Sequence, residues 1–487
     1  MSKFSTGSVE PVPAVSGDVS GGGGRFPPQI KYILGNEACE RFSFYGMKGI
    51  LALYIIGVLH KSSDASTEIV HLFGAVVYCT PLLGAWLSDQ ILGRYKTILW
   101  VSFLYCAGHG TLALSDLSAS LAFKEGCLFV GLAFIAVGAG GIKPCVSAFM
   151  GDQFGENQGR AVARAYAAFY WCINIGSLGA FLIIPWVKDE YGYGWAFAIP
   201  GILMAVATAV FWLGRSRYKH VPPARADKSR VGFFRVLIFA YTNRERREGE
   251  TRWDAARRKF RRQDVDDAVG TLRVLWVFLL IPPFFALFDQ TSSTWLLQGN
   301  QMEAFQIWGH TFSAEQMQAA NPAMVLFLIP LLTFGVYPFL GKFASPLRRM
   351  AVGMFIAAVS FGIVGWLQMR IEGGEKISLL WQVLPYLVLT VSEILVSTTG
   401  LEFAYTQAPK NMKSIITSFW LLTMTAGNLL VAGITRFMPA AVEAGSASAS
   451  SGRFFLYAKL MVATAVLFAL ATSFYKYRER TEAEAKS

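Results

Sequence analysis

Apolar stretches long enough to cross a lipid bilayer recur along almost the whole chain. The hydrocarbon core of a bilayer is about 30 Å thick, so a helix needs about 20 mostly apolar residues to cross it. Stretches of this kind lie near residues 30–58, 69–92, 97–115, 126–150, 160–187, 194–214, 274–298, 322–341, 347–370, 378–402, 413–438 and 453–475. Because backbone polar groups in lipid must pair within their own segment, the pattern predicts twelve transmembrane α-helices.

Composition favours the same fold class. The 487 residues are 54% hydrophobic and only 16% charged, and the mean hydropathy is +0.41, whereas about a quarter of the residues of a soluble domain are charged. We therefore expect an all-α polytopic membrane protein. Prolines inside the spans, such as Pro81, Pro144, Pro282 and Pro385, predict kinks or broken turns.

The spans form two groups of six, which predicts two six-helix bundles. The expected organisation is a flexible tail at 1–29, an N-terminal bundle at 30–214, a basic linker at 215–273, a C-terminal bundle at 274–475 and a second tail at 476–487. Most of the 44 Lys and Arg fall on the side of the two tails. Because loops rich in Lys and Arg stay in the cytoplasm, both termini and the linker are expected to be cytoplasmic.

The linker carries most of the excess charge. It holds 17 Lys and Arg against 8 Asp and Glu, within a chain of net charge +12. The basic character is therefore local and does not indicate a nucleic-acid partner. Two interpretations of stretch 252–268 stay open: a basic helix with Trp253 and Phe260 on one side, resting on anionic lipid, or a solvated linker.

The sequence contains no pattern typical of an enzyme. Its six cysteines are scattered through the first half without a CxxC pair, which favours buried, unpaired thiols. Phosphate loops and the HExxH and GxSxG motifs are absent as well. We expect no enzymatic activity, no metal and no cofactor. A membrane-embedded enzyme or a receptor would need a nucleophile, a metal cluster or a large soluble domain.

The first span contains charges that a lipid-facing helix does not tolerate. Glu37, Glu40, Arg41 and Lys48 interrupt the stretch NEACERFSFYGMKGILALYI, at a cost of about 2.5–3.5 kcal/mol for each ionised group at mid-depth. At 100° per residue these charges, together with Phe44 and Tyr45, fall on one stripe about 140° wide. The stripe is therefore expected to face the bundle interior or a water-filled cavity. The alternative is a salt-bridge ladder that only joins helices.

Other spans carry polar groups of the same kind. Lys143 interrupts the fourth span, Asn174 the fifth, Asp289 the seventh and Glu393 the tenth. Together with the charges of the first span they form a mixed set of positive and negative groups. Such a set is suited to a zwitterionic ligand and to a movable proton.

At these residues the sequence resembles the proton-dependent oligopeptide transporters of the major facilitator superfamily. Residues 37–46 are similar to the family motif ExxERFxYYG, and GAWLSDQILGRYKT (84–97) is similar to the superfamily signature between helices two and three. The stretch GLEFAYTQAPKNMKSIITSFWLL (400–422) resembles the family's junction between helices ten and eleven. The resemblance extends from about residue 30 to 475, and it implies the major facilitator fold.

The resemblance also implies roles for individual residues. Those implied in proton coupling are Glu37, Glu40, Arg41, His71 and Asp289, with Glu37 and Glu40 pairing in turn with Arg41 and Lys143. Lys48 and Lys143 would receive the peptide carboxylate, with Arg41 beside them, and Glu393, Asn174 and Asn321 would hold the amino end. The residues implied in lining the side-chain pockets are Tyr45, Tyr78, Phe285, Ser397 and Trp420.

Two ion pairs are implied as gates between the bundles. Lys48 with Asp289 would close the extracellular side, and Lys143 with Glu393 would close the cytoplasmic side. A proton or a bound carboxylate would compete for one member of a pair. Such competition biases the movement of the two bundles about a central site.

Several residues depart from the family pattern. Phe44 replaces the first Tyr of the YYG motif, Lys48 replaces the usual Arg, and Phe285 replaces a common Trp. Lys48 keeps the charge but loses the bidentate fork of Arg. Asp289 and His71 are similar to the animal branch of the family. For His71 two interpretations stay open, a proton carrier or a hydrogen-bonded packing residue.

The charges near helix ends are expected to have structural roles. Asp89, Arg94 and Lys96 favour contacts between helices at the cytoplasmic face, and Asp152 and Glu402 favour solvated or capping roles.

The resulting hypothesis is a symporter that imports di- and tripeptides with protons by alternating access. The alternative is a relative that carries another small solute, such as nitrate, a glucoside or a drug-like anion. The expected partners are the peptides, protons and the lipid bilayer, without an obligatory protein partner. The short loop at 370–377 and the absence of a glycosylation sequon favour a bacterial inner membrane.

Overall fold

The computed structural model is almost entirely helical. It describes residues 26–155, 158–223, 232–243, 247, 249–307, 309–336, 339, 345–409, 412–438, 449–475 and 477. The predicted tails at 1–29 and 476–487 therefore lie almost completely outside the described residues.

The first six spans are built from six helices with short extensions. They are α1 (Ile30–Gly57), α2 (Ser63–Cys79) continued by α3 (Pro81–Leu87) and the π-helix η1 (Ser88–Leu92), α4 (Arg94–Ala113) with η2 (Leu114–Leu117), α5 (Leu121–Asp152) and α6 (Gly159–Leu213). The 55-residue α6 contains two spans, because the chain turns at Gly192, where φ is 85° and ψ is 174°. A positive φ is readily adopted only by glycine.

The next six spans form the second bundle. They are α9 (Arg262–Phe278) with α10 (Pro282–Phe288), η3 (Asp289–Ser292) and α11 (Thr294–Gly299); α12 (Ala314–Met317) with α13 (Ala320–Pro330) and η4 (Leu331–Val336); α15 (Pro346–Glu372); η6 (Leu379–Gln382) with α16 (Val383–Glu393), η7 (Ile394–Thr398) and α17 (Thr399–Gln407); α18 (Lys413–Phe437); and α19 (Ser451–Ser473). A small antiparallel hairpin, β1 (Phe305–Ile307) and β2 (His310–Phe312), links the seventh and eighth spans.

The described helices account for the twelve predicted spans. Nine of them are long and apolar enough to cross a membrane, and the bent pair of α9 with α10 and α11 adds a tenth. The two others are α1, whose charges lower its hydropathy, and the second half of α6. The structure thus agrees with an all-α fold of two six-helix bundles, each with its own apolar core.

Proline and glycine explain where some spans bend. Pro81 begins α3, and Pro282 begins α10 after a bend of 44°. Pro144, in contrast, lies inside a continuous α5, so the predicted break is not seen there. At the α3–α5 contact, a Cβ built on Gly84 would come within 2.6 Å of the Gly141 Cα, so only glycine permits this approach.

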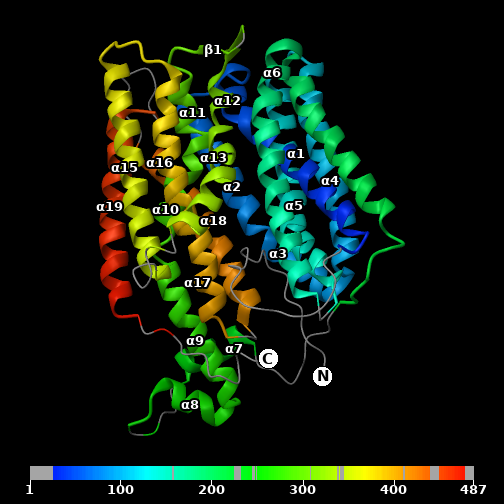
Figure 1. The fold of residues 1–487 in the computed structure, drawn as a ribbon, viewed down its shortest axis with the longest axis vertical. Helices are drawn as coiled ribbons and strands as arrows, with labels where there is room; N and C mark the ends of the chain where they lie inside the picture. Colours follow the sequence, from blue (N-terminus) through cyan, green and yellow to red (C-terminus); the bar gives the residue numbers. More distant parts are fainter. Residues whose placement is uncertain are drawn as a thin grey trace.

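The two bundles meet at one end. Figure 1 shows the N-terminal bundle in blue and cyan beside the C-terminal bundle in green to red, with α2 reaching across to α18. We call the end with β1 the hairpin side and the end with α7 (Phe233–Thr242) and α8 (Arg252–Lys259) the connector side.

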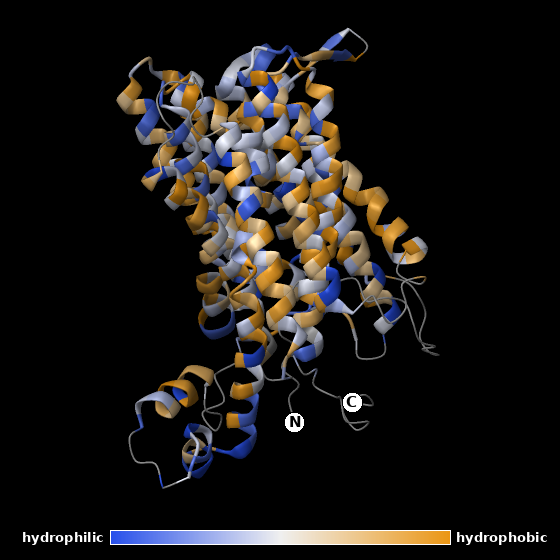
Figure 2. Ribbon diagram, turned by 90° about the vertical axis from the view of Figure 1, so that its left-hand side faces the viewer, coloured by the Kyte–Doolittle hydropathy of each residue, from blue (hydrophilic) through white to orange (hydrophobic). Residues whose placement is uncertain are grey.

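The described part of the predicted basic linker (215–273), which we call the connector, is folded. Together α7, α8 and the first turns of α9 enclose a small apolar cluster that includes Phe233, Val236 and Val265. Figure 2 shows this unit projecting to one side below the bundles. The single helix considered for 252–268 is not formed, since the chain is extended at Phe260, which separates α8 from α9.

Candidate functional site

The charged stripe of α1 faces the protein interior. Glu37, Glu40, Arg41 and Lys48 are each at most 8% exposed. The Arg41 Nε lies 3.0 Å from a Glu37 oxygen, and another guanidinium nitrogen of Arg41 pairs with Glu40. One guanidinium therefore serves both carboxylates, because residues 37 and 41 share a helix face and residue 40 is its neighbour. The prediction that this stripe avoids lipid agrees with the observed burial.

Lys143 has no carboxylate partner among the described residues. Its Nζ lies 4.6 Å from the ring centre of Phe44 and 4.4 Å from that of Tyr78. Aromatic faces attract a cation but accept no directed charge-assisted hydrogen bond. The implied pairing of Lys143 with Glu37 or Glu40 is therefore not made in this conformation, and its ammonium donors remain available.

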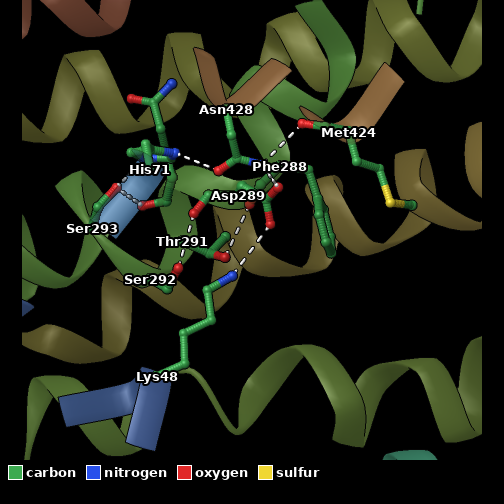
Figure 3. A network of polar contacts seen from close by, with 10 residues as sticks. Lys48, His71, Phe288, Asp289, Thr291, Ser292, Ser293, Met424 and Asn428 are labelled. Atoms are coloured by element: carbon green, nitrogen blue, oxygen red, sulfur yellow. Dashed lines mark hydrogen bonds and ion pairs between the residues drawn. The ribbon is translucent and has the colours of Figure 1, made fainter. Parts of the chain in front are cut away.

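Lys48 and Asp289 join the two bundles. The Lys48 Nζ from α1 donates to a carboxylate oxygen of Asp289 in η3 over 3.4 Å (Figure 3). The second Asp289 oxygen accepts a hydrogen bond of 2.6 Å from the Asn428 amide of α18. The ion pair implied as the extracellular gate is thus formed. Asn428, which the sequence reasoning did not single out, completes the hydrogen bonding of the carboxylate.

His71 belongs to the same network. Its Nδ1 lies 2.8 Å from the Asn428 Oδ1, and its Nε2 lies 2.8 Å from the Ser293 hydroxyl (Figure 3). Because the Asn428 amide nitrogen donates to Asp289, its oxygen is left to accept, which assigns the proton of His71 to Nδ1. In neutral His71 the Nε2 then accepts from Ser293. A second proton, bound at Nε2, would make His71 the donor to the Ser293 hydroxyl.

Packing explains how Asn428 reaches this position. A Cβ built on Gly74, one turn after His71 on α2, would come within 2.6 Å of the Asn428 Oδ1. The glycine therefore leaves the space that the Asn428 side chain occupies. His71 is fully buried with both ring nitrogens bonded, an arrangement compatible with both interpretations of this residue.

Glu393 forms a second polar centre in the C-terminal bundle. Its carboxylate accepts a hydrogen bond of 2.8 Å from the Asn321 amide, which also donates to the Thr390 hydroxyl over 3.1 Å. Glu393 ends α16 and is followed directly by the π-helical turn η7, which contains Ser397. Asn174 is not part of this centre in the contacts described, since its amide donates to its own helix at Tyr170.

The implied cytoplasmic gate is not formed. Among the described residues, no ion pair joins Lys143 and Glu393. Lys143 is held by rings and Glu393 by Asn321. The physical reason is conformational: a pair that closes one side of an alternating-access protein is broken when the other side is closed.

The ion pairs between described residues also lie mainly on one side of the protein where they join the two bundles. All four that cross between the bundles lie at Lys48 or nearer the hairpin side. Besides Lys48 with Asp289 they are Lys188 with Glu315, Glu68 with Arg436, and Asp64 with Arg453. The Gln318 amide adds a hydrogen bond of 3.0 Å to the Gly49 carbonyl. The hairpin side is therefore the closed side.

The aromatic residues implied in lining the side-chain pockets lie in two different surroundings. Tyr45 packs beside Phe181 with ring centres 5.6 Å apart, and Tyr78 lies under Lys143. Phe285 and Trp420 are each 2% exposed and pack edge to face at 5.7 Å. In this conformation they are core residues, so a lining role for them stays a prediction.

The charges near the helix ends make local contacts. Arg94 pairs with Asp152 over 2.5 Å, linking the start of α4 to the end of α5, and Arg349 pairs with Glu402 over 2.7 Å. These pairs lie within single bundles. The Arg94 pair agrees with the contact between helices expected for Arg94. Asp152, expected to be solvated or to cap a helix, is instead buried in that pair.

Known proteins resemble this chain over most of its length. A profile of the POT family matches residues 95–450. Solute carrier family 15 member 2 of Mus musculus is 38% identical over 368 residues, 72% of this chain and 50% of the relative. Peptide transporter 3 of Caenorhabditis elegans is 39% identical over 365 residues, 71% and 51% of the two chains. The chain thus spans about half the length of the curated relatives it matches.

Solved structures agree in fold as well as in sequence. A crystal structure described as an auto inhibited POT family peptide transporter is 39% identical, with a TM-score of 0.85 over 94% of this chain and 99% of that chain. The POT family transporter PepTSo is 36% identical, with a TM-score of 0.83 over 92% and 98%. The family profile, the identities and the shared fold together establish that this chain belongs to the POT family of membrane transporters.

Proposed function

We propose that the protein imports di- and tripeptides together with protons by alternating access. The observation that carries this proposal is the buried network that joins Lys48, Asp289, Asn428 and His71 across the two bundles. It combines groups that can exchange a proton with an ion pair that must break when the hairpin side opens. Relatives described as peptide transporters support peptides as the substrate class.

The ends of a peptide would be recognised by two separate centres. Lys143 offers an ammonium group without a carboxylate partner among the described residues, so a peptide carboxylate would gain a charge-assisted bond there. Glu393 with Asn321, assisted by Asn174, would receive the peptide amino group. Because every peptide carries both end charges, recognition at the ends permits variable side chains. Tyr45, Tyr78 and Ser397 would line the space between them.

Proton coupling would act through the closed side. Protonation of Asp289 removes the charge that holds Lys48, and a second proton on His71 reverses its bond to Ser293. Loss of the attraction between Asp289 and Lys48 would weaken the closed hairpin side and favour its opening. Glu37, Glu40 and Arg41 would adjust the charge next to Lys143, since the Arg41 guanidinium is shared by both carboxylates.

The placement in the cell follows from the same proposal. The hairpin side would face the exterior and the connector side, with both termini, the cytoplasm of a bacterial cell. The driving force would be the proton gradient across the inner membrane, so neither a cofactor nor a protein partner is expected.

Transport into proteoliposomes tests the proposal. With an inward proton gradient the purified protein should accumulate a labelled dipeptide above the outside concentration, and an uncoupler should abolish the accumulation. Nitrate and a glucoside serve as competing solutes. Peptide uptake that ignores the gradient would refute the coupling, and competition by nitrate or the glucoside but not by unlabelled peptide would favour the alternative substrate class.

A further inference from the structure

Helix α7 has two apolar faces, and the protein covers only one of them. Phe233, Val236 and Ala240 are buried against α8 and α9. Phe234, Ile238 and Tyr241 lie on another face and are 58%, 61% and 59% exposed. At 100° per residue these three side chains fall within about 60° of one another. A continuous stripe of large apolar side chains marks an interaction surface.

The rest of the connector does not cover the stripe. The aromatic residues of the segment once considered for lipid contact face α7 instead. Trp253 packs edge to face on Tyr241 with ring centres 6.2 Å apart, and Phe260 packs on Phe239 at 5.3 Å. These contacts fix α8 below α7, and they leave Phe234 and Ile238 exposed.

The stripe begins beside apolar residues of the second bundle. Phe234 approaches Phe419 of α18 with ring centres 6.3 Å apart. Leu275 of α9 packs against the same cluster. The exposed residues Trp276 and Leu279 follow directly on α9, 62% and 67% exposed. An apolar surface therefore continues from the bundle onto α7.

Cations surround the stripe. Arg235 is exposed on α7 itself, the Arg252 guanidinium lies 4.5 Å from the Tyr241 ring centre, and the Lys259 Nζ lies 4.2 Å from that of Phe239. None of the three pairs with a carboxylate among the described residues. A helix with an apolar stripe, aromatic rings and unpaired cations is typical of the interface of an anionic bilayer.

We propose that α7 lies in the headgroup layer of the membrane on the connector side and binds anionic phospholipid. Phe234 and Ile238 contact the acyl chains, and Arg235, Arg252 and Lys259 contact the lipid phosphates. The connector is then fixed to the membrane and to the second bundle at once. The first bundle is left to move relative to both.

Photo-crosslinking tests this placement in the full-length protein. A benzophenone amino acid replaces Ile238 in one variant and Phe234 in another, and Gln263, an exposed residue of the first turn of α9, serves as the matched control. The protein is placed in vesicles of phosphatidylcholine and phosphatidylglycerol and irradiated, and adducts are identified by mass spectrometry. Because both test positions are exposed, the fold is expected to tolerate the added ring.

The expected result is lipid adducts at 234 and 238 and none at 263. Phosphatidylglycerol should be enriched in the adducts relative to its share of the vesicle, and the enrichment should be lost when R235Q and K259Q are combined. Absence of lipid adducts at 234 and 238, or adducts to a second copy of the chain, would overturn the proposal. Adducts in proportion to vesicle composition would refute the binding of anionic lipid.

Discussion

Replacing Asn428 with alanine tests whether the polar network holds the hairpin side closed. The Asn428 amide donates to Asp289 over 2.6 Å and its carbonyl meets His71 at 2.8 Å, so both partners lose a bond in N428A. A hydrogen bond to an ionised group contributes about 1.5–3 kcal/mol. When the hairpin side opens, water replaces the lost bonds, so the loss falls mainly on the closed state.

The expected shift follows from this difference. Because 1.36 kcal/mol corresponds to tenfold, the ratio of open to closed molecules should rise by about 10- to 150-fold. T425A is the matched control, since Thr425 lies one turn earlier on α18 and makes one neutral hydrogen bond of 3.3 Å to Ala75 across the same interface. A weak neutral bond contributes about 0.5 kcal/mol, so T425A should shift the ratio about twofold.

Pulsed electron paramagnetic resonance measures the two populations. Spin labels on non-natural side chains at positions 117 and 376, both exposed on the hairpin side and one in each bundle, leave the native cysteines untouched. Wild-type protein should show mainly the short distance, and N428A a large population at longer distance. Identical distance distributions for wild type, N428A and T425A would show that Asn428 does not hold the hairpin side closed.

A second variant at the same position separates hydrogen bonding from shape. N428D keeps the side-chain size but places a carboxyl group against the Asp289 carboxylate. At low pH the protonated group donates to Asp289 as the amide does, so the hairpin side should close. As the pH rises, two like charges share the site, and the hairpin side should open. A pH-independent N428D would contradict this argument.

Three further variants test other parts of the site. E40Q removes a carboxylate beside Arg41, so it should keep counterflow exchange but lose accumulation driven by the gradient; loss of both would point to a structural role. E393A should weaken uptake of dipeptides at least about tenfold, since a charge-assisted bond of about 1.5–3 kcal/mol is lost. Uptake of amino-blocked analogues should fall far less. Equal losses for both in a competition assay would exclude Glu393 as the site of the peptide amino end. K48R should slow transport in the same proteoliposomes, because a bidentate guanidinium holds Asp289 more firmly than one ammonium at 3.4 Å. Faster transport would contradict the role of this ion pair as a gate.

The spans and the buried stripe of α1 were predictable because both depend on local pattern. Hydropathy identifies a membrane helix from about 20 consecutive residues, and helical periodicity places Glu37, Arg41 and Lys48 on one face whatever surrounds the helix. The residues at which the helices begin and end could not be predicted as well. Helix α9 begins at Arg262, before the apolar stretch that starts near residue 274, because its first turns pack against α7 and α8.

Asn428 and Ser293 were missed for a physical reason. Asn428 is a neutral polar residue in an apolar span, and Ser293 is one of several small polar residues in the run 289–294; such residues often bond to their own helix. Their importance depends on what lies opposite: α18 brings Asn428 to His71 of α2, and the junction between η3 and α11 brings Ser293 to it. Gly74 was the weak sequence signal for this contact, since a glycine inside a helix commonly permits a neighbouring side chain to approach the backbone closely.

The contrast between the two polar centres explains why a peptide would act on one side only. On the hairpin side, the Asp289 carboxylate already has a partner from each bundle, Lys48 and Asn428. A ligand would therefore form few new bonds there unless a proton on Asp289 first released these partners. Lys143 and Glu393 have no ion-pair partner in the opposite bundle among the described residues. In the proposed cycle a zwitterionic peptide would supply both missing charges. Its carboxylate and amino group would then connect the two bundles where the Lys143–Glu393 pair is absent, and departure of the peptide would leave those residues free to pair with each other and close that side.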